Sequence, residues 1–203
     1  MNKSSNFDPD VMRVGHLLAD AARAATLPFF RKADLVADNK LAGGYDPVTI
    51  ADRASSGTSG LTWVLDPIDG TRGFVSGTPT WGVLIALGDA SGPFFGIIDQ
   101  PYIGERFVGT PLGAELTGPN GKSALVTRPP RDLSQSTVMT TFPEVGSSDE
   151  GAAFAEVSRR ARLTRYGMDC YAYGLVAAGQ IDLVIEAGLQ PYDIQAPIAV
   201  VQA

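Results

Sequence analysis

WVLDPIDGTRGFVSGTPTW, residues 63–81, is the stretch of this 203-residue sequence that says most about its fold. Residues 62–65 are apolar enough to predict a buried strand, and two aspartates three residues apart, Asp66 and Asp69, follow it directly. Gly70 permits a tight turn, and a helix that begins there would direct its free N–H groups toward the same spot. The stretch therefore predicts a strand, a turn and a helix, with carboxylates at the end of the strand.

The two aspartates indicate a specific chemistry. Carboxylates, together with the backbone carbonyl of Ile68, are hard oxygen ligands that suit Mg²⁺, with Mn²⁺ as a second possibility. Pro67 stiffens the turn, and the free N–H groups of a helix start bind phosphate oxygens. Aspartates are also common in plain strand-end turns, so a short motif of this kind leaves that reading open.

Segments on both sides extend the pattern. Their spacing predicts helices and strands in alternation, which favours a layered α/β protein. We expect helices over residues 9–32, 149–160, 171–178 and 194–202, the last opened by Asp193, and strands over 81–87, 94–98, 105–109, 114–116, 136–141, 163–166 and 183–186.

Composition and charge exclude several classes of protein. The net charge of −6 argues against a nucleic-acid or anionic-membrane partner, and no apolar stretch is long enough for a membrane span. The single cysteine, Cys170, excludes an internal disulfide and a cysteine-rich zinc site. Because residues 1–10 carry no apolar signal-peptide core, we expect a cytoplasmic protein.

Three segments together identify the chain as a member of the inositol monophosphatase family by resemblance. Residues 63–81 resemble the signature of that family, and residues 46–52, DPVTIAD, are similar to its upstream Pro-Val-Thr-x-x-Asp element. Residues 191–197, PYDIQAP, resemble its late aromatic-Asp-x-x-Ala element. All three occur in the family's order. The resemblance implies the αβαβα sandwich of the sugar phosphatases, with an α+β half over residues 1–125 that carries the metal site and an α/β half over residues 126–203 that closes it.

The resemblance also implies roles for individual residues. The implied metal ligands are Asp66, the Ile68 carbonyl, Asp69 and Asp193, and the implied pair that orients the attacking water is Thr71 with Asp52. The N–H groups of Gly70 and Thr71 would hold phosphate. Glu186 falls where the family places a carboxylate that contacts the hydroxyls or amines of the substrate, although a solvated strand-end glutamate is an equal alternative.

The substrate is indicated by smaller features. Arg72 directly after the Gly-Thr pair, and residues 167–173, GMDCYAY, resemble the histidinol-phosphatase branch. Asp169 would offer a carboxylate to the amino or imidazole group of histidinol, or it could simply cap the helix that follows. We therefore expect a phosphorylated small alcohol, first of all L-histidinol phosphate, as the partner of a homodimeric enzyme. The alternatives are an inositol 1-phosphate or broad polyol phosphatase, a nucleotide phosphatase acting on 3′-phosphoadenosine 5′-phosphate, and an inactive phosphate-binding relative.

Two departures from the family pattern stand out. The family has a helix and a strand ending in Gly-Glu-Glu between its first two elements, whereas residues 53–61 fill that gap here without an acidic residue. The chain also ends about ten residues into the helix after Asp193. Either the protein lacks these parts, or the 203 residues are not all of it. Because their deletion would expose a large apolar surface, the second explanation is favoured.

Overall fold

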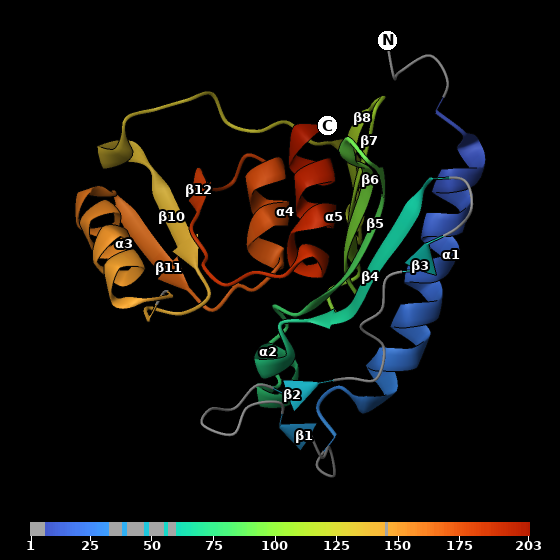
Figure 1. Cartoon of the computed structure of the whole chain (residues 1–203), viewed down its shortest axis with the longest axis horizontal. Coiled ribbons are helices and arrows are strands. Elements are labelled where there is room, and N and C mark those ends of the chain that lie inside the picture. Colours follow the sequence, from blue (N-terminus) through green and yellow to red (C-terminus); the bar gives the residue numbers. More distant parts are fainter. Residues whose placement is uncertain (1–6, 33–37, 40–46, 49–54, 57–59, 145) are drawn as a thin grey trace.

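The structure is a computed structural model that describes residues 7–32, 38–39, 47–48, 55–56, 60–144 and 146–203. Figure 1 shows its elements in five layers. Helix α1 (Pro9–Thr26) covers one face of a seven-stranded sheet, and helices α4 (Tyr171–Ala177) and α5 (Pro191–Gln202) cover the other. A three-stranded sheet and helix α3 (Ser148–Arg160) follow beyond them. The expected αβαβα sandwich is confirmed.

The large sheet is an antiparallel meander. Its strands pair in sequence order: β3 (Ser55–Ser56), β4 (Thr62–Asp69), β5 (Gly82–Asp89), β6 (Gly92–Gln100), β7 (Glu105–Thr110), β8 (Gly113–Gly118) and β9 (Gly121–Ala124). Antiparallel neighbours need only short turns, so consecutive strands stay adjacent. The strands predicted over residues 81–87 and 94–98 are present as β5 and β6, which pair antiparallel.

The small sheet is parallel. Strand β10 (Thr137–Thr140) lies between β11 (Leu163–Tyr166) and β12 (Leu183–Val184), and both of these neighbours run in its direction. Helix α3 connects β10 to β11, and α4 connects β11 to β12, as parallel pairing requires. The carboxyl ends of the parallel strands therefore meet at one edge, where β10 and β12 lead into the pocket described below.

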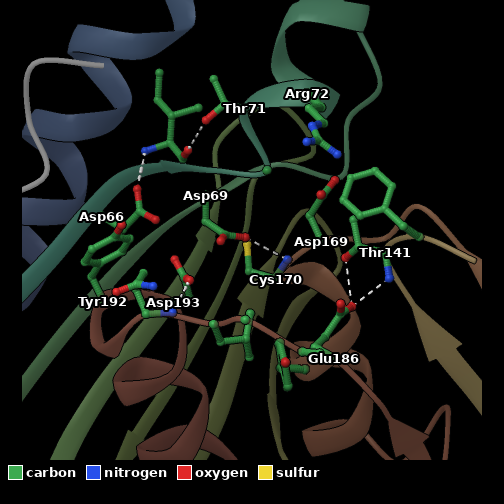
Figure 2. Close-up of a pocket in the computed structure, with 18 residues that line it drawn as sticks. Asp66, Asp69, Thr71, Arg72, Thr141, Asp169, Cys170, Glu186, Tyr192 and Asp193 are labelled. Carbon is green, nitrogen blue, oxygen red and sulfur yellow. Dashed lines mark hydrogen bonds between the residues drawn. The ribbon is translucent and has the colours of Figure 1, made fainter. Parts of the chain in front are cut away.

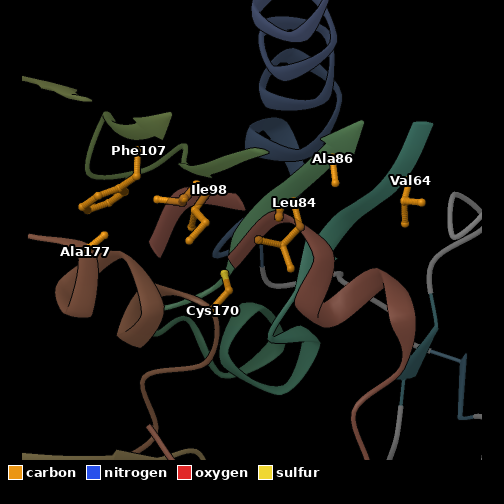
Figure 3. Packing of buried hydrophobic residues seen from close by; sticks show 9 residues of the cluster. Val64, Leu84, Ala86, Ile98, Phe107, Cys170 and Ala177 are labelled. Atoms are coloured by element: carbon orange, nitrogen blue, oxygen red, sulfur yellow. The ribbon is translucent and has the colours of Figure 1, made fainter. Parts of the chain in front are cut away.

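Strand β5 is buried on both faces, which explains its continuous apolar run. Val83, Ile85 and Leu87 pack with Phe95 and Ala19 of α1 in one core cluster. Leu84 and Ala86 alternate with them and face the other way, because successive side chains of a strand point to opposite faces. Figure 3 shows this second cluster, in which residues of the large sheet pack against α4, α5 and the segment before α4: Val64, Leu84, Ala86, Ile98, Phe107, Cys170, Ala177, Ala196 and Val200.

Helix α5 approaches the large sheet closely because two glycines face it. Gly96 of β6 and Gly109 of β7 are cross-strand partners. A Cβ atom on Gly96 would lie 2.5 Å from the Ala196 carbonyl oxygen, and one on Gly109 would lie 2.4 Å from the Ala199 carbonyl oxygen. The helix backbone therefore rests directly on the strands. This contact fixes the height of α5, whose first turn contains Asp193.

A buried ion-pair network attaches α1 to the opposite face. Asp99 of β6 is fully buried, and its carboxylate accepts hydrogen bonds from Arg23 of α1 and from Arg106 of β7, the shortest at 2.6 Å. Arg106 also donates to Asp20 at 2.7 Å and lies 3.0 Å from Nδ1 of His16. Burial, followed by the positive charge of Arg106, lowers the pKa of His16. The only histidine thus contributes to helix attachment.

Several element boundaries differ from the sequence-based expectation. Helix α1 ends at Thr26 and continues as a 3₁₀ turn, Leu27–Phe29, because Pro28 has no N–H to extend the α-helical ladder. Strand β4 runs on to Asp69, with its register shifted between Asp66 and Asp69, so that the proline lies where no ladder bond is needed. Strand β9 was not expected.

Among the remaining elements, only helix α2 was predicted. They are the two-stranded pair β1 (Asp38–Asn39) and β2 (Pro47–Val48), helix α2 (Thr71–Ser76) and a second 3₁₀ turn, Leu133–Gln135. The division at residues 125 and 126 stays a prediction, and the α4–α5 layer buries residues of both halves in one cluster. In the described part of the chain, no helix has the length and apolar character that crossing a membrane requires.

Candidate metal and substrate site

A pocket of about 430 Å³ lies where the end of β4 meets the start of α2, the segments before α4 and α5, and the carboxyl ends of β10 and β12. Figure 2 shows the side chains that line it, with carboxylates on several sides. The pocket thus contains residues that lie more than 120 positions apart in the sequence, from Asp66 to Asp193. Only the fold brings these residues together.

Three of the expected metal ligands form one acidic cluster. Asp66, Asp69 and Asp193 each offer a carboxylate oxygen, and these oxygens lie within 4.8 Å of one another. Asp66 is buried, and its Oδ1 accepts a hydrogen bond of 3.1 Å from the Ile68 amide. Asp193 is in the first turn of α5, where its Oδ2 accepts from the Gln190 amide at 2.7 Å. Helix α5 begins two residues before Asp193, at Pro191, so this aspartate belongs to a capping box and does not open the helix.

The electrostatics of the cluster fit a divalent cation. Burial and the nearby charge of Asp169 raise the pKa of Asp69 to about 7, although hydrogen bonds from Cys170 oppose the shift and Asp193 adds to it. The Cys170 amide donates to Asp69 Oδ2 at 2.8 Å. Crowded carboxylates that cannot all ionise comfortably are stabilised by a nearby positive charge. An all-oxygen donor set of this kind matches Mg²⁺ or Mn²⁺.

The predicted turn after β4 is present. Gly70 adopts a left-handed conformation with φ of 79°, which glycine reaches without steric cost, and it precedes α2 as the N-cap residue. The Thr71 hydroxyl donates to the Ile68 carbonyl at 3.1 Å. Ile68 lines the pocket, and its carbonyl oxygen retains a second lone pair. The structure thus places Ile68, Gly70 and Thr71 beside the acidic cluster, while their roles as ligand and phosphate-binding residues stay predictions.

Asp52, the predicted partner of Thr71, lies outside the described residues, as does most of the 53–61 segment. Arg72 lines the pocket at the start of α2, and its guanidinium carbon lies 4.4 Å from the centre of the Phe142 ring. A guanidinium at this distance gains from the negative face of the ring. Arg72 is therefore present at the pocket, and its predicted contact with substrate stays a prediction.

Both predicted substrate-binding carboxylates line the pocket. Asp169 precedes α4 and accepts a hydrogen bond of 2.9 Å from the Thr80 hydroxyl. Glu186 follows β12 and accepts from the amide and the hydroxyl of Thr141, at 2.6 Å and 2.8 Å. Burial raises the pKa of each carboxyl group, against these hydrogen bonds. Glu186 is thus held in place, which argues against the alternative of a solvated strand-end charge. Asp169 does not cap α4, whose N-cap residue is Cys170.

Sequence reasoning missed several residues of the pocket. Thr141 and Phe142 follow β10, Tyr173 comes from α4, and Tyr192 from α5. Ligands of open parallel sheets bind at the carboxyl ends of the strands, and this rule could have indicated the residues after β10. No comparable signal marks the two tyrosines, because aromatic residues in short helices usually belong to the core.

The sequence model of the inositol monophosphatase family matches residues 48–203, about three quarters of the chain. The chain therefore belongs to the inositol monophosphatase family. Together with the names of its relatives, this membership indicates a phosphoric monoester hydrolase.

Among the most similar relatives is a chloroplastic bifunctional phosphatase, IMPL2, of Arabidopsis thaliana. It is 37% identical over 216 residues, which cover 93% of this chain and 61% of the plant protein. A histidinol-phosphatase of Streptomyces coelicolor is 30% identical, with 95% of this chain and 83% of the relative covered. Among solved structures, an inositol monophosphatase from Zymomonas mobilis superposes with a TM-score of 0.81 at 35% identity, over 95% of this chain and 82% of its own.

The match to the plant relative is longer than the part of this chain that it covers. The match to the plant relative runs over 216 positions, more than the 203 residues of this chain, so that relative carries residues within the matched span that this chain lacks. The chain spans only about three fifths of the plant protein. The relatives' names include both histidinol and inositol phosphatases, so the family alone leaves the substrate undecided.

Proposed function

We propose that this protein hydrolyses a small phosphate monoester in a Mg²⁺-dependent reaction, and that its preferred substrate is L-histidinol phosphate. The observation that carries the proposal is the cluster of Asp66, Asp69 and Asp193, whose carboxylate oxygens lie within 4.8 Å of one another at the pocket. This donor set would hold the metal, and Mn²⁺ could replace Mg²⁺ because both prefer oxygen ligands.

A bound divalent cation would supply Lewis acidity toward phosphate and water at neutral pH. The residues of the chain would do the positioning. The Ile68 carbonyl would complete the ligand set, and the N–H groups of Gly70 and Thr71 at the start of α2 would donate hydrogen bonds to the phosphate oxygens. The Thr71 hydroxyl, already directed at the Ile68 carbonyl, would orient the attacking water together with Asp52. Since the three aspartates serve as ligands, none acts as a nucleophile.

The preference for histidinol phosphate rests on two carboxylates of the pocket that are not expected to be metal ligands. Asp169 and Glu186 both line the pocket (Figure 2), and Phe142 also belongs to the lining. Two fixed carboxylates favour an ammonium or imidazolium group over an uncharged polyol, because hydrogen bonds between opposite charges are about twice as strong as neutral ones. Arg72 would face the phosphate side of the substrate. This arrangement fits an amino alcohol phosphate.

Two alternatives have specific support. The structural similarity to the Zymomonas mobilis inositol monophosphatase favours a broad polyol phosphatase. The segment 53–61, which has no acidic residue where the family has a Gly-Glu-Glu sequence, favours an inactive relative that binds phosphate ligands. The proposal also includes a homodimer, which the family resemblance supports, and size-exclusion chromatography with light scattering would test it.

The deciding experiment measures phosphate release from histidinol phosphate and from inositol 1-phosphate, with Mg²⁺ and with EDTA. We expect faster release from histidinol phosphate and none with EDTA. The Asp69→Asn variant should lose activity by a factor on the order of 100 or more, because it removes a ligand charge while preserving shape. Asp149→Asn, at an exposed position near the start of α3, serves as the matched control and should keep full activity.

Each remaining outcome has a defined meaning. Comparable rates on the two substrates would replace the histidinol proposal with a broad monophosphatase. Release that persists in EDTA, or near wild-type activity of Asp69→Asn, would contradict the metal site. No release from either substrate, at saturating Mg²⁺, would move the assignment to the inactive relative or to a nucleotide substrate.

A further inference from the structure

The carboxylate of Asp169 occupies an unusual position against the first turn of α2. Its backbone has φ of 45°, the left-handed region that non-glycine residues rarely adopt, although aspartate tolerates it better than most. Figure 2 shows its side chain directed toward α2 and Arg72. A residue kept in such a conformation beside a pocket is held there by its surroundings, and conformations of this kind cluster at functional sites.

Three residues form the seat of this carboxylate: Gly70, Gly73 and Thr80. A Cβ atom on Gly70 would lie 2.7 Å from both Cβ and Cγ of Asp169, and one on Gly73 would lie 2.9 Å from its Oδ2. The side chain therefore rests directly on the helix backbone, which only glycines allow. The Thr80 hydroxyl donates to Oδ2 at 2.9 Å, and this is the only hydrogen bond to the Asp169 side chain from the described residues.

The seat leaves one carboxylate oxygen for another partner. Oδ2 is engaged by Thr80, whereas Oδ1 receives no hydrogen bond from the described part of the chain. Asp169 itself is partly exposed at the pocket. Without the Thr80 hydroxyl, the carboxylate could rotate and present either oxygen, and the entropy of that freedom would be lost on binding.

We propose that Thr80 is a positioning residue, which fixes the carboxylate of Asp169 so that the pocket selects a phosphate ester with a cationic alcohol. This inference rests on the proposed function and names the residue that gives it its selectivity. Thr80 lies outside the pocket lining, so it acts through Asp169 and touches no substrate. Thr78 is not independent of Thr80, because the two hydroxyl oxygens lie 3.4 Å apart. Ser76 offers the matched comparison instead, because its hydroxyl donates to the Arg72 carbonyl at 2.8 Å and to no carboxylate of the described residues, and it lies outside the pocket lining.

The test measures binding of L-histidinol and of inositol, both without phosphate, by titration calorimetry on the full chain. This readout does not depend on turnover. We expect Thr80→Val to bind histidinol about tenfold more weakly than wild type, the effect of losing one hydrogen bond to a charged group. Inositol binding should not change. Thr80→Ser should restore histidinol binding, and Ser76→Ala should leave it at the wild-type level.

A double-mutant cycle separates positioning from a general effect on structure. If Thr80 acts through Asp169, then adding Thr80→Val to Asp169→Asn should weaken histidinol binding no further. Additive losses, or wild-type binding by Thr80→Val, would overturn the inference, and so would failure of the wild-type protein to bind histidinol. Gly73→Ala provides a second variant with an intact hydroxyl, and it should also weaken histidinol binding by displacing the carboxylate.

The proposed function fails in a different way from this inference. If the wild-type protein released no phosphate but bound histidinol in a Thr80-dependent manner, the proposed enzymatic activity would be contradicted and the positioning role of Thr80 supported. If wild type and Thr80→Val both hydrolysed histidinol phosphate selectively, with equal kcat/KM, the proposed enzymatic activity would be supported and the positioning role of Thr80 contradicted.

Discussion

Gly96→Ala tests whether the close approach of α5 to the large sheet positions the metal site. The new Cβ atom would lie 2.5 Å from the Ala196 carbonyl oxygen and 2.9 Å from the Cβ of Ala199, where ordinary contacts begin at 3.4 Å. Because both neighbours belong to a helix, no single side chain can rotate away. The helix must move outward by about 1 Å to restore a normal contact.

Two magnitudes follow from this displacement. Overpacking a core destabilises the folded state by about 1–3 kcal/mol, whereas replacing glycine by alanine stabilises it by about 0.4–1 kcal/mol because it restricts the unfolded chain. We therefore expect the free energy of unfolding to fall by about 1–2 kcal/mol. For a chain of this size, that loss lowers Tm by about 2–8 °C. Ala196 lies one turn after Asp193, so the metal ligand moves with the helix. A misplacement of about 1 Å can reduce the rate on the order of 100-fold.

The assay combines thermal unfolding, followed by circular dichroism, with Mg²⁺-dependent phosphate release at a temperature where both proteins are folded. Gly118→Ala is the matched control, since its Cβ atom would meet atoms of Glu105 alone, and the single tight contact, 3.1 Å to Cγ, is with a flexible side chain. The control should keep wild-type Tm and rate. If Gly96→Ala also kept both, the reasoning that α5 is fixed by direct backbone contact would be refuted.

Three further predictions concern charges. Burial acts to raise the pKa of Asp182, but a hydrogen bond from an amide of β10 and the charges of two arginines lower this pKa overall. Asp182→Asn should therefore lower the free energy of unfolding in urea by about 1–3 kcal/mol at neutral pH. That stabilisation is present above about pH 4 and is lost as the pH falls through the lowered pKa. A stability difference between wild type and Asp182→Asn that increased at acidic pH would contradict this prediction. Asp99→Asn should lower the free energy of unfolding by about 3–5 kcal/mol in the same assay, because it removes the buried negative charge that pairs with Arg23 and Arg106. A loss below about 1 kcal/mol would show that other contacts hold α1. Mg²⁺ at 100 times its Kd should stabilise the wild-type protein by about 2.7 kcal/mol and leave Asp69→Asn unchanged, and equal stabilisation of both would argue against the cluster.

Much of the fold could be predicted from local patterns. The apolar runs of β5 and β6 and the amphipathic stretch of α1 mark buried elements, because periodicity reflects which side chains face the core. Boundaries were less predictable. The α-helical hydrogen bonding of α1 does not continue through Pro28, which has no N–H. Strand β4 continues past Pro67 because the register shifts there, so no ladder hydrogen bond from the proline is required. Strand β9 has four exposed residues and therefore carries no apolar signal.

The sequence by itself determined the chemistry of the site's first half. Asp66, Asp69 and Gly70 lie within five residues, so the strand, the turn and the start of α2 bring their functional groups together by local geometry alone. The family resemblance, through residues 191–197, added Asp193 as a distant ligand, and the acidic cluster includes it.

Only the tertiary structure decided how the distant residues complete the pocket. Asp193 reaches the other aspartates because glycines let α5 rest on the large sheet, and Glu186 is held because β10 and β12 are parallel and end at the same edge. The Thr80 hydroxyl meets Asp169 across 89 residues. Contacts of this kind depend on backbone approach and strand direction in three dimensions, and neither leaves a periodic signal in the sequence.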